Sequence, residues 1–197
     1  GLGSIPAEKR NPLELETRGI GELILQLVDQ GVKTICVGIG GSATNDGGIG
    51  MAAGLGVAFY DDQGHLLRPV GASIGRVARI DTSAVPKALQ DIELQVLTDV
   101  TNPLCGSQGA TYIFGGRKGL NPLLFPAVDQ AMQDFYQLAD ARILSMPSAG
   151  AGGGMAAGLV AFAGGQISSG IEKSLDLIDF NHKVQKADLV VVGEGRM

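Results

Sequence analysis

The amino-acid sequence predicts a layered α/β domain with a mainly parallel or mixed sheet flanked by helices. Segments with the periodicity of an amphipathic helix alternate along the chain with short, apolar, β-branched runs. Each of these apolar runs ends in a glycine-rich or polar turn, as strands of α/β proteins commonly do. The 197 residues suffice for one ordinary domain with a core, and we therefore expect residues 1–197 to form a single α/β domain.

The first half of the chain alternates helix and strand twice. Residues 17–31 predict an amphipathic helix, because apolar residues fall on one face at helical spacing and Gly31 can end it. Residues 33–39 form a short β-branched run, which is typical of a buried strand. A glycine-rich loop follows, and then a tightly packed helix over residues 49–55 and a strand over residues 57–60 are expected.

The second half repeats this alternation. Residues 93–98 predict a strand, and Asn121 followed by Pro122 is a favourable start for the next helix. Ser169 and Glu172 have the spacing of a capping box, which predicts a further helix. Residues 188–192 predict a last buried strand that runs into a glycine turn. A strand–turn unit that stops there leads us to expect a fragment of a longer polypeptide.

Composition and charge exclude several classes of protein. Hydrophobic residues make up 45 % and charged residues 18 % of the chain. A disordered sequence instead combines low hydrophobicity with high charge. The net charge is −5 and basic residues do not cluster, so we expect no nucleic acid partner. No apolar run is long enough to span a membrane, so we expect no membrane partner. Cys36 and Cys105 lack metal-ligand spacing and are predicted to be small buried residues of a reducing, cytoplasmic compartment.

Glycine is concentrated in four loops that follow or flank the apolar runs. Residues 38–50, 105–119, 150–158 and 193–195 hold 18 of the 31 glycines. Glycine lets the backbone approach a ligand closely, and ligands of open α/β sheets bind at the carboxyl ends of the strands. The first loop adds hydroxyl, amide and carboxylate side chains. This combination predicts an anion-binding site built by the loops.

Charged residues in the same loops favour phosphoryl transfer, which needs carboxylates for Mg²⁺ or an acceptor hydroxyl and cations for phosphates. Asp46 and Asp99 each follow a predicted strand, and Lys118 lies between glycines. Glu194 and Arg196 follow the last predicted strand. Each also has a structural interpretation: Asp46 can cap a helix, Asp99 can cap a turn, Lys118 can be solvated, and Arg196 can pair with Glu194.

Two generic motifs leave alternatives open. Gly38-x-Gly40-x-x-Ala43 follows a predicted strand and fits the fingerprint of an NAD(P)-binding oxidoreductase, although the next helix contains four glycines. Residues 71–75 match the G-x-S-x-G nucleophile elbow, but Pro69 interrupts the strand that the motif requires. A non-catalytic domain that binds a small anion is the third interpretation.

The loop of residues 40–48, GGSATNDGG, resembles the bacterial ATP-dependent glycerate kinase family of the glycerate 2-kinase type. Further matches to that family follow in the same order along the chain: PAEKRNP at 6–12, TRG at 17–19, GELI at 21–24, TDVTNPL at 98–104, IFG at 113–115, KG at 118–119, GA at 150–151, GGM at 153–155, SGIE at 169–172 and GEGR at 193–196. The resemblance covers essentially the whole chain. Gly116, Arg117, Ser148 and Gly152 depart from the residues usual in the family.

The resemblance implies a cytoplasmic kinase that uses ATP and Mg²⁺ to phosphorylate a hydroxyl of D-glycerate, usually to 2-phosphoglycerate. It implies that this chain is the central part of a two-domain kinase, lacking N- and C-terminal parts, and it leaves association into a homo-oligomer open. Asp46 and Asp99 become candidates for catalysis and for metal binding. The candidate substrate- and nucleotide-binding residues are Arg18, Gly40, Gly41, Ser42, Thr44, Asn45, Asn102, Lys118, Gly153, Gly154, Glu194 and Arg196.

Overall fold

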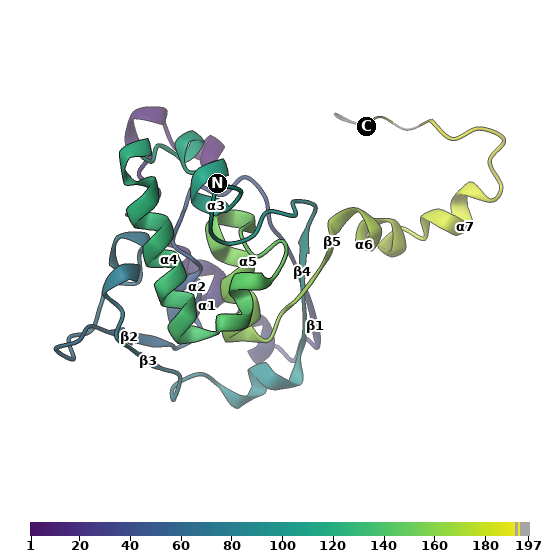
Figure 1. The fold of residues 1–197 in the computed structure, drawn as a ribbon. Helices are drawn as coiled ribbons and strands as arrows, with labels where there is room; N and C mark the ends of the chain where they lie inside the picture. The colour runs from purple at the N-terminus through teal and green to yellow at the C-terminus, as the bar shows by residue number, and fades with distance from the viewer. Residues whose placement is uncertain (192, 194–197) are drawn as a thin grey trace.

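The computed structural model describes residues 1–191 and 193, and a parallel sheet lies at one side of its helices (Figure 1). The three strands β1 (Thr34–Gly38), β4 (Glu93–Thr98) and β5 (Gln166–Ser169) lie in the order β1-β4-β5. Both strand pairs are parallel, and Val96 of β4 lies between Val37 of β1 and Ile167 of β5. The predicted α/β architecture and the predicted strands over 33–39 and 93–98 are confirmed.

Helices cover one face of this sheet (Figure 1). They are α1 (Arg18–Asp29), α2 (Ile49–Gly54) and α5 (Ala151–Ala163), and their apolar side chains form one core cluster with Ile35, Leu94 and Val96 of the strands. The other face of β1 is exposed, because alternate strand residues point to opposite sides. Cys36 lies on that exposed face, so its predicted burial is wrong. Cys105 is half-buried.

A second layer packs on the outer side of α2 and α5. It contains α3 (Ala110–Phe114) and α4 (Phe125–Ala139). The buried Met132, Phe135 and Tyr136 of α4 belong to a second core cluster, separate from the one on the sheet. The Asn121 side chain accepts a hydrogen bond from Leu123 N at 3.0 Å and opens a short 3₁₀ turn that leads into α4. The predicted helix start is therefore confirmed.

The strand expected over residues 57–60 forms, but outside the central sheet. β2 (Ala58–Tyr60) pairs antiparallel with β3 (Arg79–Asp81) in a separate two-stranded sheet. Phe59 fixes β2 there, because its ring packs 5.9 Å from the rings of both Phe135 and Phe162. β3 had no periodic sequence signal, since only three residues make it.

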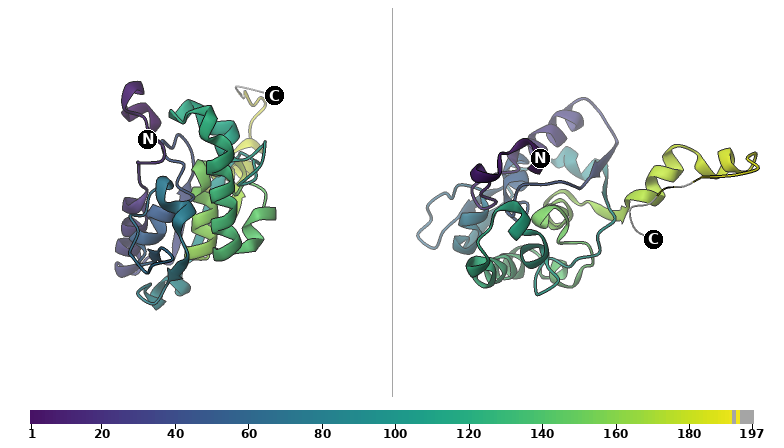
Figure 2. Two further views of the ribbon diagram at one scale, coloured as in Figure 1. Left: turned by 60° about the vertical axis from the view of Figure 1, so that its left-hand side comes forward. Right: turned by 90° about the horizontal axis from the view of Figure 1, so that it is seen from above.

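The last described part of the chain extends away from the layered body as helices α6 (Gly170–Leu177) and α7 (Phe180–Val184) (Figures 1 and 2). The predicted helix start at Ser169 is confirmed, because Ser169 Oγ accepts a hydrogen bond from Glu172 N at 3.3 Å, which is one of the two hydrogen bonds of a capping box. Residues 188–191 form no strand, and Leu189 is 79 % exposed. The predicted strand is wrong over those residues: no neighbouring strand of the described chain pairs with them.

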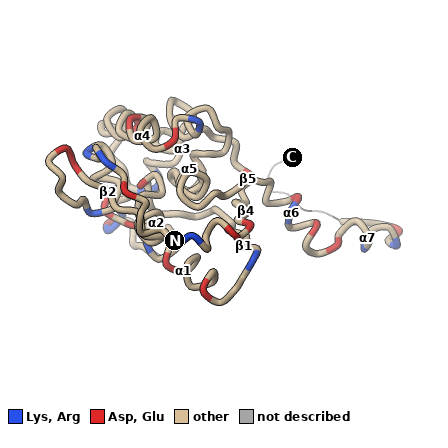
Figure 3. Tube along the Cα trace, turned by 90° about the horizontal axis from the view of Figure 1, so that it is seen from below, with Lys and Arg blue, Asp and Glu red and all other residues tan. Residues whose placement is uncertain are grey.

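The charged residues are spread over the elements. In Figure 3 the Lys and Arg positions are scattered along the trace among the Asp and Glu positions. Within residues 1–191 and 193, no helix has both the length and the apolar character needed to cross a membrane.

Candidate active site

The parallel strands direct two loops and the start of one helix to one edge of the sheet. The loop after β1 begins at Ile39, the loop after β4 begins at Asp99, and α6 begins at Gly170 directly after β5. The carboxyl ends of parallel strands are the usual ligand-binding edge of an open α/β sheet. The structure also brings the glycine-rich start of α5 and the short α3–η5 segment to this edge, where η5 is the 3₁₀ turn Gly116–Lys118.

A left-handed glycine turn packs against the loop after β1. Gly152, Gly153 and Gly154 have φ values of 69°, 76° and 88°, which side-chain-bearing residues rarely adopt. A Cβ atom on Gly153 would lie 2.2 Å from the Thr44 carbonyl oxygen and 2.8 Å from Lys118 Nζ. Glycine is therefore required here so that α5 can approach the loop. Gly153 O accepts a hydrogen bond from Gly47 N at 3.0 Å, which fixes the approach.

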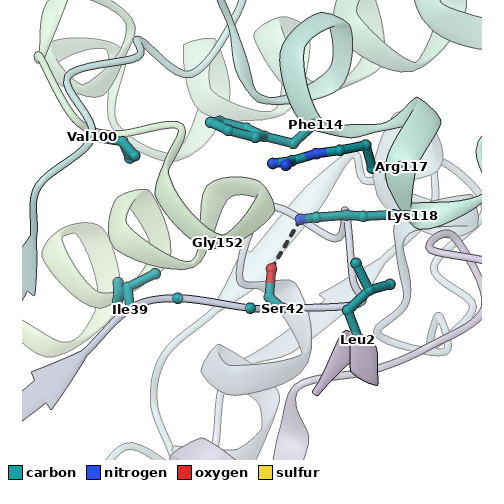
Figure 4. A pocket seen from close by; sticks show the side chains of 10 residues that line it. Leu2, Ile39, Ser42, Val100, Phe114, Arg117, Lys118 and Gly152 are labelled. Carbon is teal, nitrogen blue, oxygen red and sulfur yellow. Dashed lines mark hydrogen bonds between the residues drawn. The ribbon is translucent and has the colours of Figure 1, made fainter. Parts of the chain in front are cut away.

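Lys118 is the buried cation of the site. Its Nζ donates hydrogen bonds to Ser42 Oγ at 2.9 Å and to the Thr44 carbonyl at 2.6 Å (Figure 4). The side chain is only 5 % exposed, and burial lowers the pKa of Lys118 to about 8, although Asp46 acts in the opposite direction. Within the described part of the chain no carboxylate forms an ion pair with it. An ammonium has three donors, so one remains for a ligand.

A cavity of about 190 Å³, which we call the lysine cavity, opens beside Lys118. In Figure 4 the Arg117 guanidinium lies between the Phe114 ring and the Lys118 side chain. The Arg117 guanidinium carbon is 5.8 Å from the centre of the Phe114 ring, within cation–π range. Lys118 is buried whereas Arg117 is exposed, so low polarity strengthens the attraction of an anion to Lys118 in particular. The cavity is lined by Leu2, Ile39, Gly40, Gly41, Ser42, Val100, Phe114, Arg117, Lys118 and Gly152.

Two further cavities adjoin the lysine cavity. The α1 cavity, about 330 Å³, shares Ile39, Gly40, Gly41, Ser42 and Gly152 with it and extends to α1. The hydroxyl cavity, about 970 Å³, shares Val100 with it and is lined by Asp99 together with Thr98, Thr101, Ser148, Ser168 and Ser169. The three cavities follow one another along the carboxyl edge of the sheet.

Asp46 lies inside the protein and outside these cavities. Its Oδ2 accepts hydrogen bonds from Thr17 Oγ1 at 2.7 Å and Gly50 N at 3.4 Å, and its Oδ1 accepts one from Gly48 N at 3.1 Å. Thr17 Oγ1 in turn accepts from Met51 N at 2.8 Å. The carboxylate therefore caps the start of α2 and ties it to α1. Burial raises the pKa of Asp46, and the hydrogen bonds oppose that rise.

Asp99 and Asn102 occupy the loop after β4. Asp99 is exposed at the hydroxyl cavity, and its Oδ1 accepts a hydrogen bond from Ile171 N at 3.1 Å. The Asn102 Nδ2 donates to the Gln108 carbonyl at 2.9 Å and the Asn102 carbonyl accepts from Gly150 N at 3.1 Å. Asn102 thus supports the loop and the start of α5, whereas Asp99 has an accessible carboxylate.

The predicted site residues are only partly brought together. Gly40, Gly41, Ser42 and Lys118 line the lysine cavity, Thr44 and Gly153 lie directly behind it, and Asp99 lies in the adjoining hydroxyl cavity. Asn45 is fully buried and donates to Thr111 Oγ1 at 3.0 Å, and Gly154 packs against Gly47. Arg18 begins α1 and lines none of the three cavities. Glu194 and Arg196 lie outside the described residues.

Several lining residues were not among the predicted ones. Arg117 and Gly152 are next in sequence to the predicted residues Lys118 and Gly153, and this proximity was the one indication that they could line the site. Phe114 and Val100 carried no signal, because an apolar side chain in a loop or short helix is more often part of a core. Their role as cavity walls depends on how distant segments meet.

The two generic motifs do not have the structural context they need. A dinucleotide fingerprint requires a tight turn from strand to helix, whereas ten residues separate β1 from α2 and α2 has only six residues. Ser73 of the G-x-S-x-G match lies in the 3₁₀ segment Gly71–Arg76, and Leu66 before it makes only an isolated bridge to Tyr60. The G-x-S-x-G match therefore lacks the strand–turn–helix structure of a nucleophile elbow.

Comparison with known proteins identifies the family of the chain. The model of the glycerate kinase family matches residues 1–197. A glycerate kinase of Neisseria meningitidis is 55 % identical over all of this chain, and a glycerate 2-kinase of Escherichia coli is 40 % identical over all of it. Each alignment covers 53 % of the relative, so the chain spans about half the length of the curated relatives it matches.

A solved structure has the same fold. The crystal structure assigned to glycerate kinase 2 of Salmonella typhimurium LT2 is 42 % identical and superposes with a TM-score of 0.90. The match covers all of this chain and 54 % of that one. With a family model that matches every residue and relatives that match over the full chain, the chain belongs to the glycerate kinase family.

Proposed function

We propose that the protein carrying this chain is an ATP-dependent glycerate kinase, which transfers the γ-phosphoryl group of ATP to a hydroxyl of D-glycerate. The observation that carries the proposal is the lysine cavity at the carboxyl edge of the parallel sheet, in a chain of the glycerate kinase family. Phosphate and carboxylate are the groups that such a cationic, glycine-lined cavity favours.

Lys118 and Arg117 are the proposed phosphate-binding residues. Lys118 is held by Ser42 and Thr44 and keeps one N–H for a phosphate oxygen. The neighbouring Arg117 offers a planar guanidinium that can contact two oxygens at once. Phosphoryl transfer passes through a loose transition state whose charge is spread over the equatorial oxygens. Cations that are positioned before the reaction stabilise that charge at little reorganisation cost.

Asp99 is the proposed ligand for Mg²⁺. Magnesium in kinases is typically held by one or two carboxylates together with the phosphates of the nucleotide. Asp99 fits this role because it is exposed, and because its Oδ1 accepts one hydrogen bond, from Ile171 N, among the described residues. The described residues contain no cluster of three or more His, Cys, Asp or Glu side chains that could hold a metal. When bound, Mg²⁺ would neutralise the charge on the phosphates.

Asp46 fits neither a metal ligand nor a base in this arrangement. Both of its oxygens accept hydrogen bonds, and no part of it reaches a cavity. We therefore assign Asp46 to the support of the loop that carries Ser42 and Thr44. Thr17 shares this supporting role, because its hydroxyl links Asp46 to α2.

The proposal is tested by coupling ADP production to NADH oxidation, with the intact protein that carries this sequence. We expect ADP to form from MgATP only when D-glycerate is added. Lys118→Met should abolish this activity, whereas Lys9→Met should retain it, because Lys9 is exposed and lines none of the three cavities. Absence of glycerate-dependent ADP with both Mg²⁺ and Mn²⁺ would exclude the proposed reaction.

A further inference from the structure

The α1 cavity takes no part in the proposed handling of phosphates, yet it joins the lysine cavity. The two share the loop Ile39–Ser42 and Gly152. The side chains that the α1 cavity adds are mainly apolar, among them Leu15, Ile20, Val37 and Met155. None of its lining residues is Lys or Arg, and its single charged side chain is that of the exposed Glu16. A phosphate or carboxylate would meet no cationic side chain there.

We propose that the α1 cavity binds the nucleobase of the nucleotide, with the phosphates extending along residues 39–42 into the lysine cavity. This inference rests on the proposed kinase function, since ATP combines one apolar aromatic ring system with an anionic chain. The two adjoining cavities differ in charge in the same way: the lysine cavity is lined by two cationic side chains, Arg117 and Lys118, and the α1 cavity by none. The volume of about 330 Å³ is in the range of small-molecule sites.

Ile20 supports this assignment. It lies in the first turn of α1, lines the α1 cavity, and is 38 % exposed. A nucleobase in the cavity would cover this apolar surface and so gain hydrophobic stabilisation. Leu23, one turn further along the same helix, is 51 % exposed but lines neither cavity. The two residues therefore form a matched pair for a test.

The test compares two ligands by calorimetry with the intact protein: ADP, which has the base, and inorganic tripolyphosphate, which lacks it. Ile20→Gln does not change the charge of the site, so the binding of phosphate groups should be unaffected. We expect this variant to bind ADP about five- to tenfold more weakly and to bind tripolyphosphate within about twofold of the unsubstituted protein. Leu23→Gln should change neither affinity.

A competition experiment tests the assignment without any substitution. Adenosine should displace ADP from the unsubstituted protein but leave bound tripolyphosphate in place, because only the base site is contested. Wild-type ADP affinity in Ile20→Gln, or equal weakening of both ligands, would overturn the nucleobase assignment. So would adenosine that displaces tripolyphosphate. These binding results are independent of turnover, so failure of glycerate-dependent ADP formation would be recognised separately as failure of the proposed function.

Discussion

Replacing the buried ammonium of Lys118 should change how stability depends on pH. The folded protein holds Lys118 with two hydrogen bonds and no ion pair to a described carboxylate, and burial lowers its pKa from 10.5 to about 8. Between pH 8 and pH 10.5 the unfolded chain therefore binds this proton while the folded chain has lost it. The free energy of unfolding rises with pH wherever the unfolded state binds more protons.

The size of the effect follows from the two pKa values. A difference of one unit between the unfolded and folded pKa values corresponds to about 1.4 kcal/mol. Holding the charged Lys118 therefore lowers the free energy of unfolding by about 3 kcal/mol below pH 8. This cost disappears as the pH approaches 10.5. Lys118→Met has no such proton. The variant also loses the two hydrogen bonds to Ser42 and Thr44, but that loss does not change with pH.

The assay is urea unfolding followed by circular dichroism at pH 7.5 and at pH 10.5, for the unsubstituted protein and for Lys118→Met. The buffers contain no phosphate, because a bound anion would restore the charge of Lys118. We expect the unsubstituted protein to gain about 3 kcal/mol relative to the variant between the two pH values. The exposed Lys9→Met controls for loss of a lysine. A stability difference that stays constant across this range would refute the inference that Lys118 is charged and uncompensated.

Three further substitutions test the residues that support the site and the proposed metal ligand. Gly153→Ala should destabilise the protein by about 2 kcal/mol or more, seen as a lower melting temperature, because its Cβ would clash with Thr44 O at positive φ; an unchanged melting temperature would contradict this. Asp46→Asn should cost about 2 kcal/mol of stability and reduce turnover only as far as the folded fraction falls; loss of turnover at full stability would restore its catalytic assignment. Asp99→Asn should lower kcat about a hundredfold and raise the Mg²⁺ requirement with little change in melting temperature; wild-type kinetics would remove Asp99 from the site.

The sequence pattern was sufficient to predict three of the main elements. The helix over 17–31 has regular apolar spacing and the strand over 33–39 is a short apolar, β-branched run; these two elements and the strand over 93–98 were each found within a few residues of their predicted limits. The face of β1 that carries Cys36 could not be predicted, because a run with β-branched residues is compatible with burial on one or both sides. The pairing of β2 with β3 was equally hidden, since Phe59 is placed by contacts with Phe135 and Phe162.

The site was predictable in kind but not in detail. Glycine runs and a lysine between glycines pointed to particular loops, and the structure brings loops of that kind together at the carboxyl edge of the sheet. Whether a carboxylate faces a cavity or caps a helix depends on tertiary position, and Asp46 and Asp99 look alike in the sequence. The structure separates them: Asp46 is enclosed by its hydrogen-bond donors, whereas Asp99 remains accessible.

A crystal structure of the intact protein with ADP and D-glycerate tests most directly whether the lysine cavity holds the phosphates of the nucleotide. We predict a phosphate oxygen within hydrogen-bond distance of Lys118 Nζ, about 2.7–3.2 Å, with Ser42 still bound to the same ammonium. Phosphates bound elsewhere, with Lys118 contacting only Ser42 and Thr44, would contradict it.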